Sequence, residues 1–86
     1  MKRKWVASPF YRAVIEKIKS ARIEAGISQR QLAERLGKHP SFVNKIELIE
    51  RRIDVLEFIA IARAMGIPAS HLMDQLSEAL PDTFDI

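Results

Sequence analysis

Residues 27–47 read I-S-Q-R-Q-L-A-E-R-L-G-K-H-P-S-F-V-N-K-I-E, and this stretch predicts two short helices joined by a tight turn. Ser28 is a favourable N-cap, and Gln31 completes a capping box that satisfies two amide donors at the helix start. The apolar face that follows at helical spacing consists of Leu32, Ala33 and Leu36. Gly37 can adopt the left-handed conformation that ends a helix, so we expect this helix to cover residues 29–36.

A second helix is predicted over residues 40–47. Pro40 suits the first helical position, because its φ is preset and the amide hydrogen that it lacks would have no partner there. The buried side is expected to carry Phe42, Val43 and Ile46, and the opposite side Ser41, Asn44 and Lys45. Such a pair of helices is typical of a helix-turn-helix, whose second helix can enter the major groove of DNA. An ordinary helical hairpin with a solvated polar face would have the same pattern.

The flanks of this stretch carry a resemblance to a known family. Residues 20–47 read S-A-R-I-E-A-G-I-S-Q-R-Q-L-A-E-R-L-G-K-H-P-S-F-V-N-K-I-E, followed by E-R-R-I-D-V-L-E-F and A-R-A-M-G-I. Over about Ile15 to Met73 the chain resembles the Cro/repressor-type helix-turn-helix family, also called the XRE family of transcriptional regulators. The resemblance implies an all-α, compact five-helix, lambda-repressor-like domain with its helix-turn-helix at residues 28–47. It also implies a sequence-specific DNA-binding regulator, which we interpret as a dimeric repressor that reads the major groove with helix 40–47.

Three further helices complete the predicted all-α fold, and they cover residues 9–25, 55–65 and 68–80. Ser8 caps the first of these, Asp54 and Glu57 form a second capping box, and Pro81 stops the last helix. The predicted organisation is a basic N-terminal arm (1–7), a DNA-binding domain (8–80) and a C-terminal tail (81–86).

The segment after Glu47 departs from the resembled family. Many family members have a glycine and a proline where this chain has Ile49 and Ile53. Because a helix without a glycine terminator can continue, we expect helix 40–47 to extend by about one further turn. The path of Arg51 and Arg52 depends on this extension.

Composition and charge suit one small DNA-binding domain. The chain has 86 residues, of which 48% are hydrophobic, and this is enough for a single modest core. No apolar run approaches the roughly 20 residues of a membrane-spanning helix, and the basic N-terminus is not followed by the continuous apolar segment typical of a signal peptide, so we expect a cytoplasmic protein outside any membrane. Residues 1–52 hold 13 of the 14 Lys and Arg residues and have a net charge of +8, whereas residues 53–86 have a net charge of −5. This asymmetry is expected if one face binds a polyanion, although solvated helices can also produce it.

Base readout is expected from the early exposed positions of helix 40–47, which are Pro40, Ser41, Asn44 and Lys45. Asn can bond adenine, Lys can donate to guanine, and Ser can serve either base. Pro40 has no donor, so it would make an apolar contact or none.

Phosphate binding is expected from Gln29, Arg30, Lys38, Arg51 and Arg52. The roles of Gln29, Arg51 and Arg52 are implied by the resemblance, whereas Arg30 and Lys38 are expected to add charge. The resemblance also implies a structural ion pair between Arg22 and Glu47. An exposed arginine near a helix C-terminus is the alternative for Arg22.

The C-terminal part is the predicted homodimer interface, through Leu76, Leu80, Phe84 and Ile86. It could equally fold back on its own monomer. The acidic and apolar C-terminal third could instead bind a protein partner, as in antitoxins that also repress their own operon. Lys2, Arg3 and Lys4 of the arm could reach along DNA.

Enzyme activity is not indicated. His39 and His71 are far apart in the sequence and lack metal-ligand spacing, and the chain has neither cysteine nor a glycine-rich phosphate loop. We therefore expect no catalytic residue, metal or cofactor, and double-stranded DNA as the partner.

Overall fold

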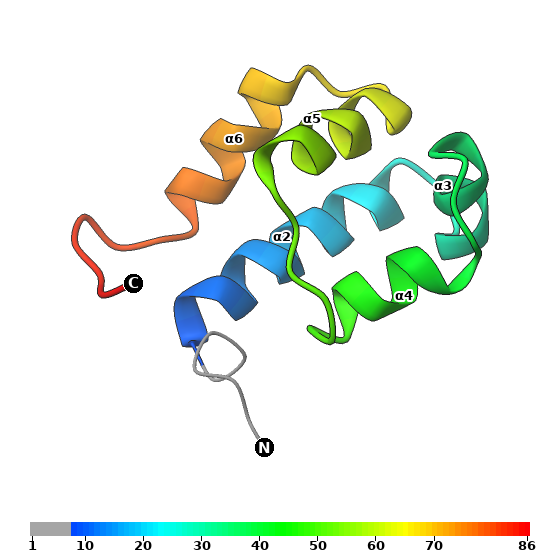
Figure 1. Ribbon diagram of the computed structural model, residues 1–86. Coiled ribbons are helices and arrows are strands. Elements are labelled where there is room, and N and C mark those ends of the chain that lie inside the picture. The colour runs from blue at the N-terminus through cyan, green and yellow to red at the C-terminus, as the bar shows by residue number, and fades with distance from the viewer. Residues whose placement is uncertain (1–7) are drawn as a thin grey trace.

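The computed structural model describes residues 8–86, which form five helices and contain no strand. The helices are α2 (Pro9–Glu24), α3 (Gln29–Arg35), α4 (Ser41–Glu47), α5 (Val55–Ala64) and α6 (Ala69–Glu78). The long helix α2 runs through the middle, with α3 and α4 on one side and α5 and α6 on the other (Figure 1). The predicted all-α fold is confirmed, and apart from the end of α4 the helix ends agree with the predicted ones to within two residues. The predicted arm, residues 1–7, lies outside the described residues.

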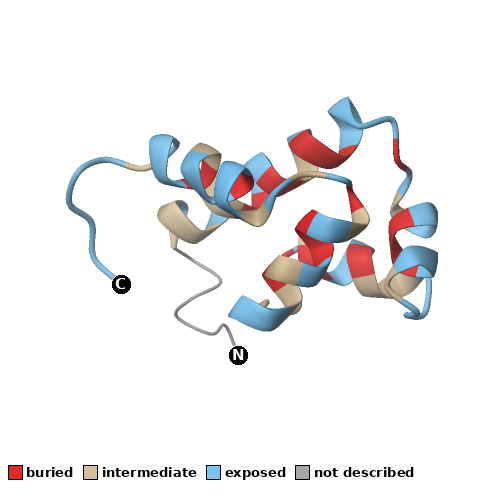
Figure 2. Cartoon of the chain, turned by 90° about the horizontal axis from the view of Figure 1, so that it is seen from above, coloured by how far each residue is buried: buried red, intermediate tan, exposed pale blue. Residues whose placement is uncertain are grey.

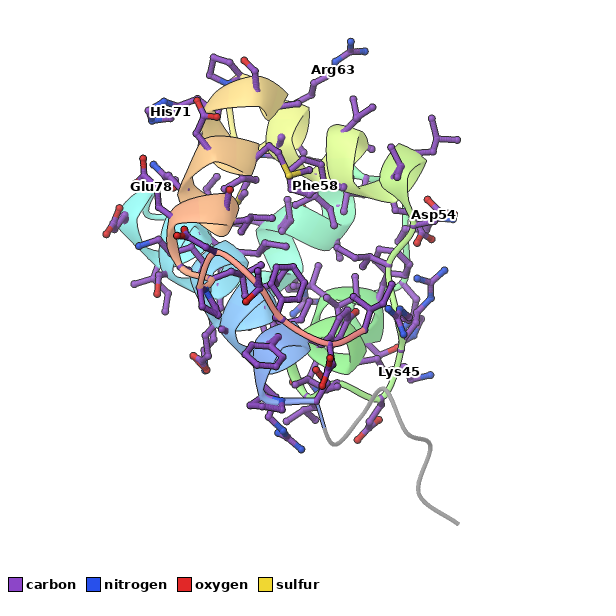
Figure 3. The ribbon with its side chains drawn as sticks, turned by 90° about the vertical axis from the view of Figure 1, so that its left-hand side faces the viewer. Lys45, Asp54, Phe58, Arg63, His71 and Glu78 are labelled. Carbon is purple, nitrogen blue, oxygen red and sulfur yellow. The ribbon has the colours of Figure 1, made fainter. Side chains whose placement is uncertain are left out.

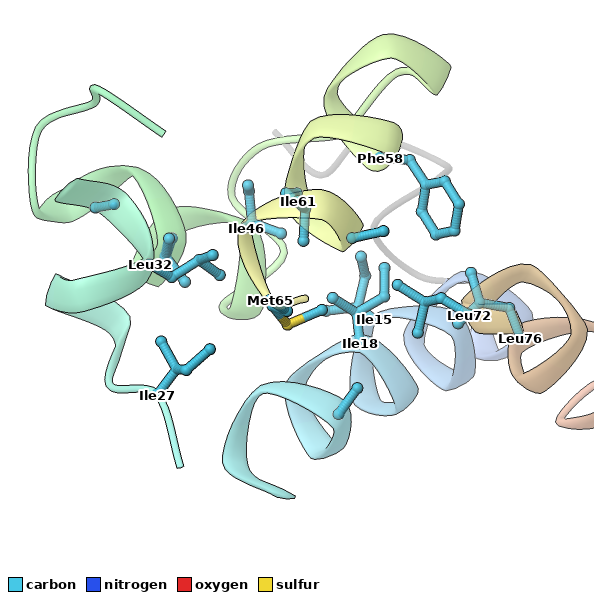
Figure 4. Packing of buried hydrophobic residues seen from close by; sticks show 14 of the residues in the cluster. Ile15, Ile18, Ile27, Leu32, Ile46, Phe58, Ile61, Met65, Leu72 and Leu76 are labelled. Carbon is cyan, nitrogen blue, oxygen red and sulfur yellow. The ribbon is translucent and has the colours of Figure 1, made fainter. Parts of the chain in front are cut away.

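One hydrophobic core joins the five helices (Figure 4). Its most deeply buried members are Ile15, Ile18, Leu32, Ala33, Val43, Ile46, Ile61, Ala62 and Leu72, each at most 3% exposed. In α2, α4, α5 and α6 buried residues recur three or four positions apart, and in α3 the two buried residues are adjacent; exposed residues cover the outer sides of the helices (Figure 2). Helices α3 and α4 have seven residues each and are too short to be stable alone, so this shared core stabilises them.

In three of the helices, the side chain of the N-cap residue itself caps the N-terminus. Ser8 Oγ accepts a hydrogen bond from the Tyr11 amide at 3.2 Å. Both predicted capping boxes are present, at the starts of α3 and α5. These caps satisfy amide donors that have no partner within a helix, which explains why the sequence located the helix starts correctly.

Helix α4 ends at Glu47, so the prediction that it extends by a further turn is wrong. Ile49 has a φ of 60°, and the following amide, of Glu50, donates to the Lys45 carbonyl at 2.8 Å. This is the helix ending that glycine usually forms. A side chain in this conformation costs about 1–2 kcal/mol, whereas burying isoleucine contributes about 1.5–3 kcal/mol. Because Ile49 is only 6% exposed, burial offsets the backbone cost and the helix ends without a glycine.

The C-terminal residues after α6 fold back toward the start of α2. The rings of Phe84 and Phe10 lie 5.5 Å apart between centroids, tilted by 39°. Two adjoining hollows of about 760 and 580 Å³ lie beside this contact, and both are lined by Tyr11, Val14, Arg52, Leu80 and Phe84.

Within residues 8–86 no single helix is long and apolar enough to cross a membrane. Only α5 and α6 together have that length and composition, and they are bent by 111° at their junction.

Candidate nucleic-acid interface

The outward face of α4 carries the predicted base-reading residues. Asn44 and Lys45 are exposed, whereas Val43 and Ile46 on the opposite face are buried. Lys45 lies on the opposite side of the molecule from Arg63 and His71 (Figure 3). Helix α4 therefore presents polar side chains outward and is held by its apolar face.

The start of α4 depends on a residue that we predicted only as part of the turn. Pro40 has φ −53° and ψ −28°, which are helical values as predicted, and it has no side-chain cap of its own. His39 supplies the cap, because its Nδ1 accepts a hydrogen bond from the Ser41 amide at 3.1 Å. The same Nδ1 lies 2.9 Å from Ser41 Oγ. The hydroxyl group of Ser41 is thus positioned by His39.

The end of α4 is tied to α2 and α3 through Glu47. Arg22 Nε donates to Glu47 Oε2 at 2.7 Å, and Arg22 Nη2 donates to Glu47 Oε1 at 3.0 Å. The expected ion pair is therefore present, with Arg22 only 8% exposed. Gln29 Nε2 also donates to Glu47 Oε1, at 2.8 Å, and this contact links the start of α3 to the end of α4. Breaking a buried pair of this kind costs about 3–5 kcal/mol, because one charge is left buried without a partner.

A second ion pair, which was not predicted from the sequence, lies just after α4. Both oxygens of Glu57 accept hydrogen bonds from Arg51, and Arg51 Nη1 also donates to the Arg52 carbonyl at 3.0 Å. The hydrogen bond from Arg51 lowers the pKa of Glu57 and raises that of Arg51. Arg51, predicted as a phosphate ligand, is thus also a structural residue that joins the segment after α4 to the start of α5.

The ring of Phe42 brings two predicted phosphate ligands together. Arg51 Cζ lies 4.8 Å from the ring centroid, and Lys38 Nζ lies 5.5 Å from it. Both distances are typical of a cation–π contact. Phe42 was predicted only as a buried residue, but its side chain is half-exposed.

The other predicted phosphate ligands lie in different surroundings. Arg52 is exposed and lies over the Tyr11 ring, 5.0 Å from its centroid. Tyr11 accepts a hydrogen bond from the Ile53 amide at 3.3 Å, and burial raises the pKa of its hydroxyl group. Arg30 Nε lies 3.8 Å from Glu34 on the exposed face of α3. A pair as exposed as this adds little stability.

The predicted dimer surface requires a correction. Leu76 is only 5% exposed and belongs to the core of the monomer, so its prediction as an interface residue is wrong. Leu80 is half-buried, whereas Phe84 and Ile86 are exposed. Three further exposed apolar residues were not predicted to lie on the surface: Val55 and Leu56 at the start of α5 and Met73 on α6. Their helical spacing resembles that of core residues, so only the packing reveals them.

Comparisons with known proteins place this geometry among helix-turn-helix proteins. The sequence profile of the helix-turn-helix family matches residues 18–72. An XRE-family like protein from Pseudomonas syringae pv. tomato str. DC3000 is 42% identical, with a TM-score of 0.76 over 84% of this chain and 88% of that chain. No curated protein sequence shows a significant match.

Two other solved structures share the fold at low sequence identity. The restriction-modification controller protein C.Esp1396I is 21% identical, with a TM-score of 0.76 over 84% of this chain and 95% of that chain. The clp gene regulator ClgR from C. glutamicum is 16% identical, with a TM-score of 0.74 over 88% of this chain and 99% of that chain. At these identities the likeness concerns the fold alone.

Proposed function

We propose a function from the premise that this chain belongs to the XRE-type helix-turn-helix family and is therefore a DNA-binding transcriptional regulator. Within this family we propose that it is a dimeric repressor, which inserts α4 into the major groove of two half-sites. One observation carries the proposal: α4 is fixed at its end through Glu47 while Asn44 and Lys45 remain exposed. Because DNA is its target, we expect the protein to act in the cytoplasm.

Base readout is assigned to Pro40, Ser41, Asn44 and Lys45. Asn44 suits adenine, since its amide can donate and accept at the same time, and Lys45 suits the acceptors of guanine. Ser41 would contact a base edge from the first turn of α4, and its hydroxyl group lies 2.9 Å from His39 Nδ1. Pro40 is exposed and would supply an apolar contact, such as one to a thymine methyl group.

Phosphate binding is assigned to Gln29, Arg30, Lys38, Arg51 and Arg52. Among the described residues Gln29 donates one Nε2 hydrogen, to Glu47, so its second amide hydrogen would be available for a phosphate oxygen. Arg51 has five N–H donors, and the oxygens of Glu57 and Arg52 take three of them among the described residues. The pairing of Arg51 with Glu57 is thus compatible with a phosphate contact.

Dimerisation is assigned to the apolar surface formed by the start of α5, by α6 and by the C-terminal residues. Val55 is 73% exposed and Leu56 is 77% exposed, and exposed apolar residues that form a contiguous patch are typical of an interaction site. Val55, Met73 and Phe84 line the same hollow, so these segments form one surface. A second copy of the chain would cover it and place two α4 helices on one face.

The dimer can be tested by measuring the mass in solution over a range of protein concentrations. Val55→Asp should shift the equilibrium toward the monomer, because a carboxylate cannot be buried in the interface without a partner. Ile23→Asp is the matched control, since Ile23 is 57% exposed but lies near the C-terminal end of α2. The C-terminal residues of the chain contact the opposite end of this helix, at Phe10. A monomer at all concentrations would reject the dimer.

Specific DNA binding, which the proposed repression requires, can be tested by fluorescence anisotropy. The wild-type protein is titrated with DNA from its own upstream region and with a scrambled duplex, each over a series of salt concentrations. We expect tighter binding to the upstream duplex and a steep decrease in affinity with salt, because phosphate contacts release counterions. Weak and equal binding to both duplexes would reject a specific regulator of this region.

A second candidate function is an antitoxin-like protein that binds a protein partner and represses its own operon. The observation that favours it is the combination of exposed apolar side chains with acidic residues, Asp82 and Asp85, in the same C-terminal part. Co-purification of a small basic protein with the wild type but not with Val55→Asp would support this function. Purification of the chain alone from its native host would argue against it.

A further inference from the structure

Two cations converge on the ring of Phe42 from different parts of the chain. Lys38 belongs to the turn before α4, and Arg51 belongs to the segment after it. Phe42 lies between them in the first turn of α4 and packs against the hydrophobic core, which fixes the orientation of its ring. Like charges repel one another, so their convergence needs a compensating attraction.

Phe42 and Glu57 together supply that attraction. The electron-rich face of an aromatic ring attracts a cation, and both Lys38 and Arg51 lie within the range of this contact. Glu57 neutralises one positive charge through its two hydrogen bonds with Arg51. The charge of Lys38 also contributes to the lowered pKa of Glu57. The two cations and one carboxylate have a net charge of +1, and a net positive charge attracts anions.

We propose that Phe42 is a positioning residue that holds Lys38 and Arg51 as a pair of phosphate-binding cations. This inference rests on the proposed DNA-binding function. It assigns to Phe42 a role that differs from base contact and is additional to core packing. A free lysine or arginine side chain loses rotamer entropy when it binds phosphate. Cations that the ring already holds lose less rotamer entropy on binding. The pair would therefore bind the phosphate backbone of DNA more tightly than two mobile side chains would.

The position of Phe42 also couples this phosphate contact to base readout. Phe42 follows Ser41 directly in α4 and precedes Asn44 by two residues, so the ring moves together with the base-reading face. The phosphate contact would therefore set how α4 is seated in the groove, as phosphate contacts generally fix the register of a protein on DNA.

The test is a double-mutant cycle on a scrambled duplex, where phosphate contacts dominate the affinity. Lys38→Gln is made in the wild type and in Phe42→Leu. In the wild type it should weaken binding and reduce the salt slope by about one. In Phe42→Leu the same change should weaken binding less than it does in the wild type, and the two factors should differ by about threefold or more. The reason is that leucine has no ring face to hold the ammonium group. Equal factors in both backgrounds would overturn the proposal.

Phe42→Tyr is the conservative variant, since it keeps the ring. It should show the wild-type effect of Lys38→Gln, and a tyrosine variant that behaves like leucine would refute the role of the ring. Circular dichroism and thermal unfolding would show whether each variant folds. A purely structural role of Phe42 would change the stability of the protein but not the coupling between Phe42 and Lys38 in DNA binding.

A measurement on the wild type keeps the proposal testable even if Phe42→Leu does not fold. The ε-methylene protons of Lys38 should resonate upfield of their usual positions in the NMR spectrum, because the ring current of Phe42 shields them. Unshifted resonances would overturn the proposal.

If the wild type binds neither duplex, the proposed function fails and this inference fails with it. If the wild type binds DNA and the cycle is additive, this inference alone fails.

Discussion

The two turns that flank α4 have the same backbone shape but different residues at their left-handed positions. Gly37 has a φ of 67° in the turn before α4, and Ile49 has a φ of 60° in the turn after it. The amide–carbonyl distances that close the two turns are 2.9 and 2.8 Å. Gly37 is exposed and a Cβ there would meet nothing within 4 Å, whereas the Ile49 side chain lies in the core.

This difference teaches that one helix ending can be specified in two ways. Glycine specifies the turn locally, because its backbone adopts positive φ without a steric cost. At Ile49 the backbone alone opposes the turn, and burial of the side chain supplies the compensating free energy. The first mechanism can be recognised in a sequence, but the second requires knowledge of what surrounds the residue.

The largest effect is expected from removing the packing at Ile49. Ile49→Ala keeps a Cβ in the left-handed conformation but loses most of the buried side chain, so it should lower the free energy of unfolding by about 2–4 kcal/mol. Ile49→Gly loses the same contacts but relieves the backbone cost, so it should be less destabilising than Ile49→Ala by about 1 kcal/mol. Urea unfolding monitored by circular dichroism measures both. An alanine variant at least as stable as the glycine variant would contradict the compensation argument.

A substitution between the two turns should separate contact with DNA from stability. Asn44→Ala should lower the affinity for the specific site by about 1–3 kcal/mol and leave binding to a scrambled duplex nearly unchanged, because only base contacts are lost. Its free energy of unfolding should remain close to that of the wild type, since Asn44 is exposed. Anisotropy titrations with both duplexes measure the first effect. An equal loss on both would show that Asn44 does not read bases.

A smaller effect is expected at the locally specified turn. Gly37→Ala should lower the free energy of unfolding by about 1–2 kcal/mol, and this cost should arise from the backbone alone because the added methyl group meets no neighbour. Gly37→Asn is the control and should cost less, since asparagine tolerates the left-handed conformation. Equal unfolding midpoints in urea for glycine and alanine would show that this turn does not need positive φ in solution.

The smallest effect is expected from the Arg51–Glu57 ion pair that follows the second turn. Glu57→Gln should lower stability at neutral pH by less than about 1 kcal/mol, because both side chains are partly exposed. The pKa of Glu57 is lowered in the folded state, so the pair stabilises the protein fully above its unfolded-state pKa, near the ordinary value of 4.5. This stabilisation is lost as the pH falls through the lowered pKa.

Urea unfolding at neutral and acidic pH measures this contribution. The difference between the wild type and Glu57→Gln should shrink as the pH falls, because the wild-type carboxylate becomes protonated. A difference that does not change with pH would mean that the charge of Glu57 does not contribute.

Several features of the interface could be predicted because they depend on residues that are close in the sequence. The capping boxes at Ser28 and Asp54 involve a partner three residues away, so the helix starts followed directly from residue types. The ion pair between Arg22 and Glu47 spans 25 positions, and only the resemblance to a known family indicated it. The pair between Arg51 and Glu57 was missed because the capping box already accounted for Glu57.

The sequence by itself determined the five helices, their amphipathic faces and the glycine turn that joins α3 to α4, because local hydrogen bonding and periodic burial govern these features. Only the tertiary structure decided where α4 ends, which apolar residues remain exposed, and that Lys38 and Arg51 meet on one ring. Those outcomes depend on free energies of burial and on charge contacts between segments that are distant in the chain. No local pattern records such contacts, because the same residue types would remain solvated in another arrangement of the helices.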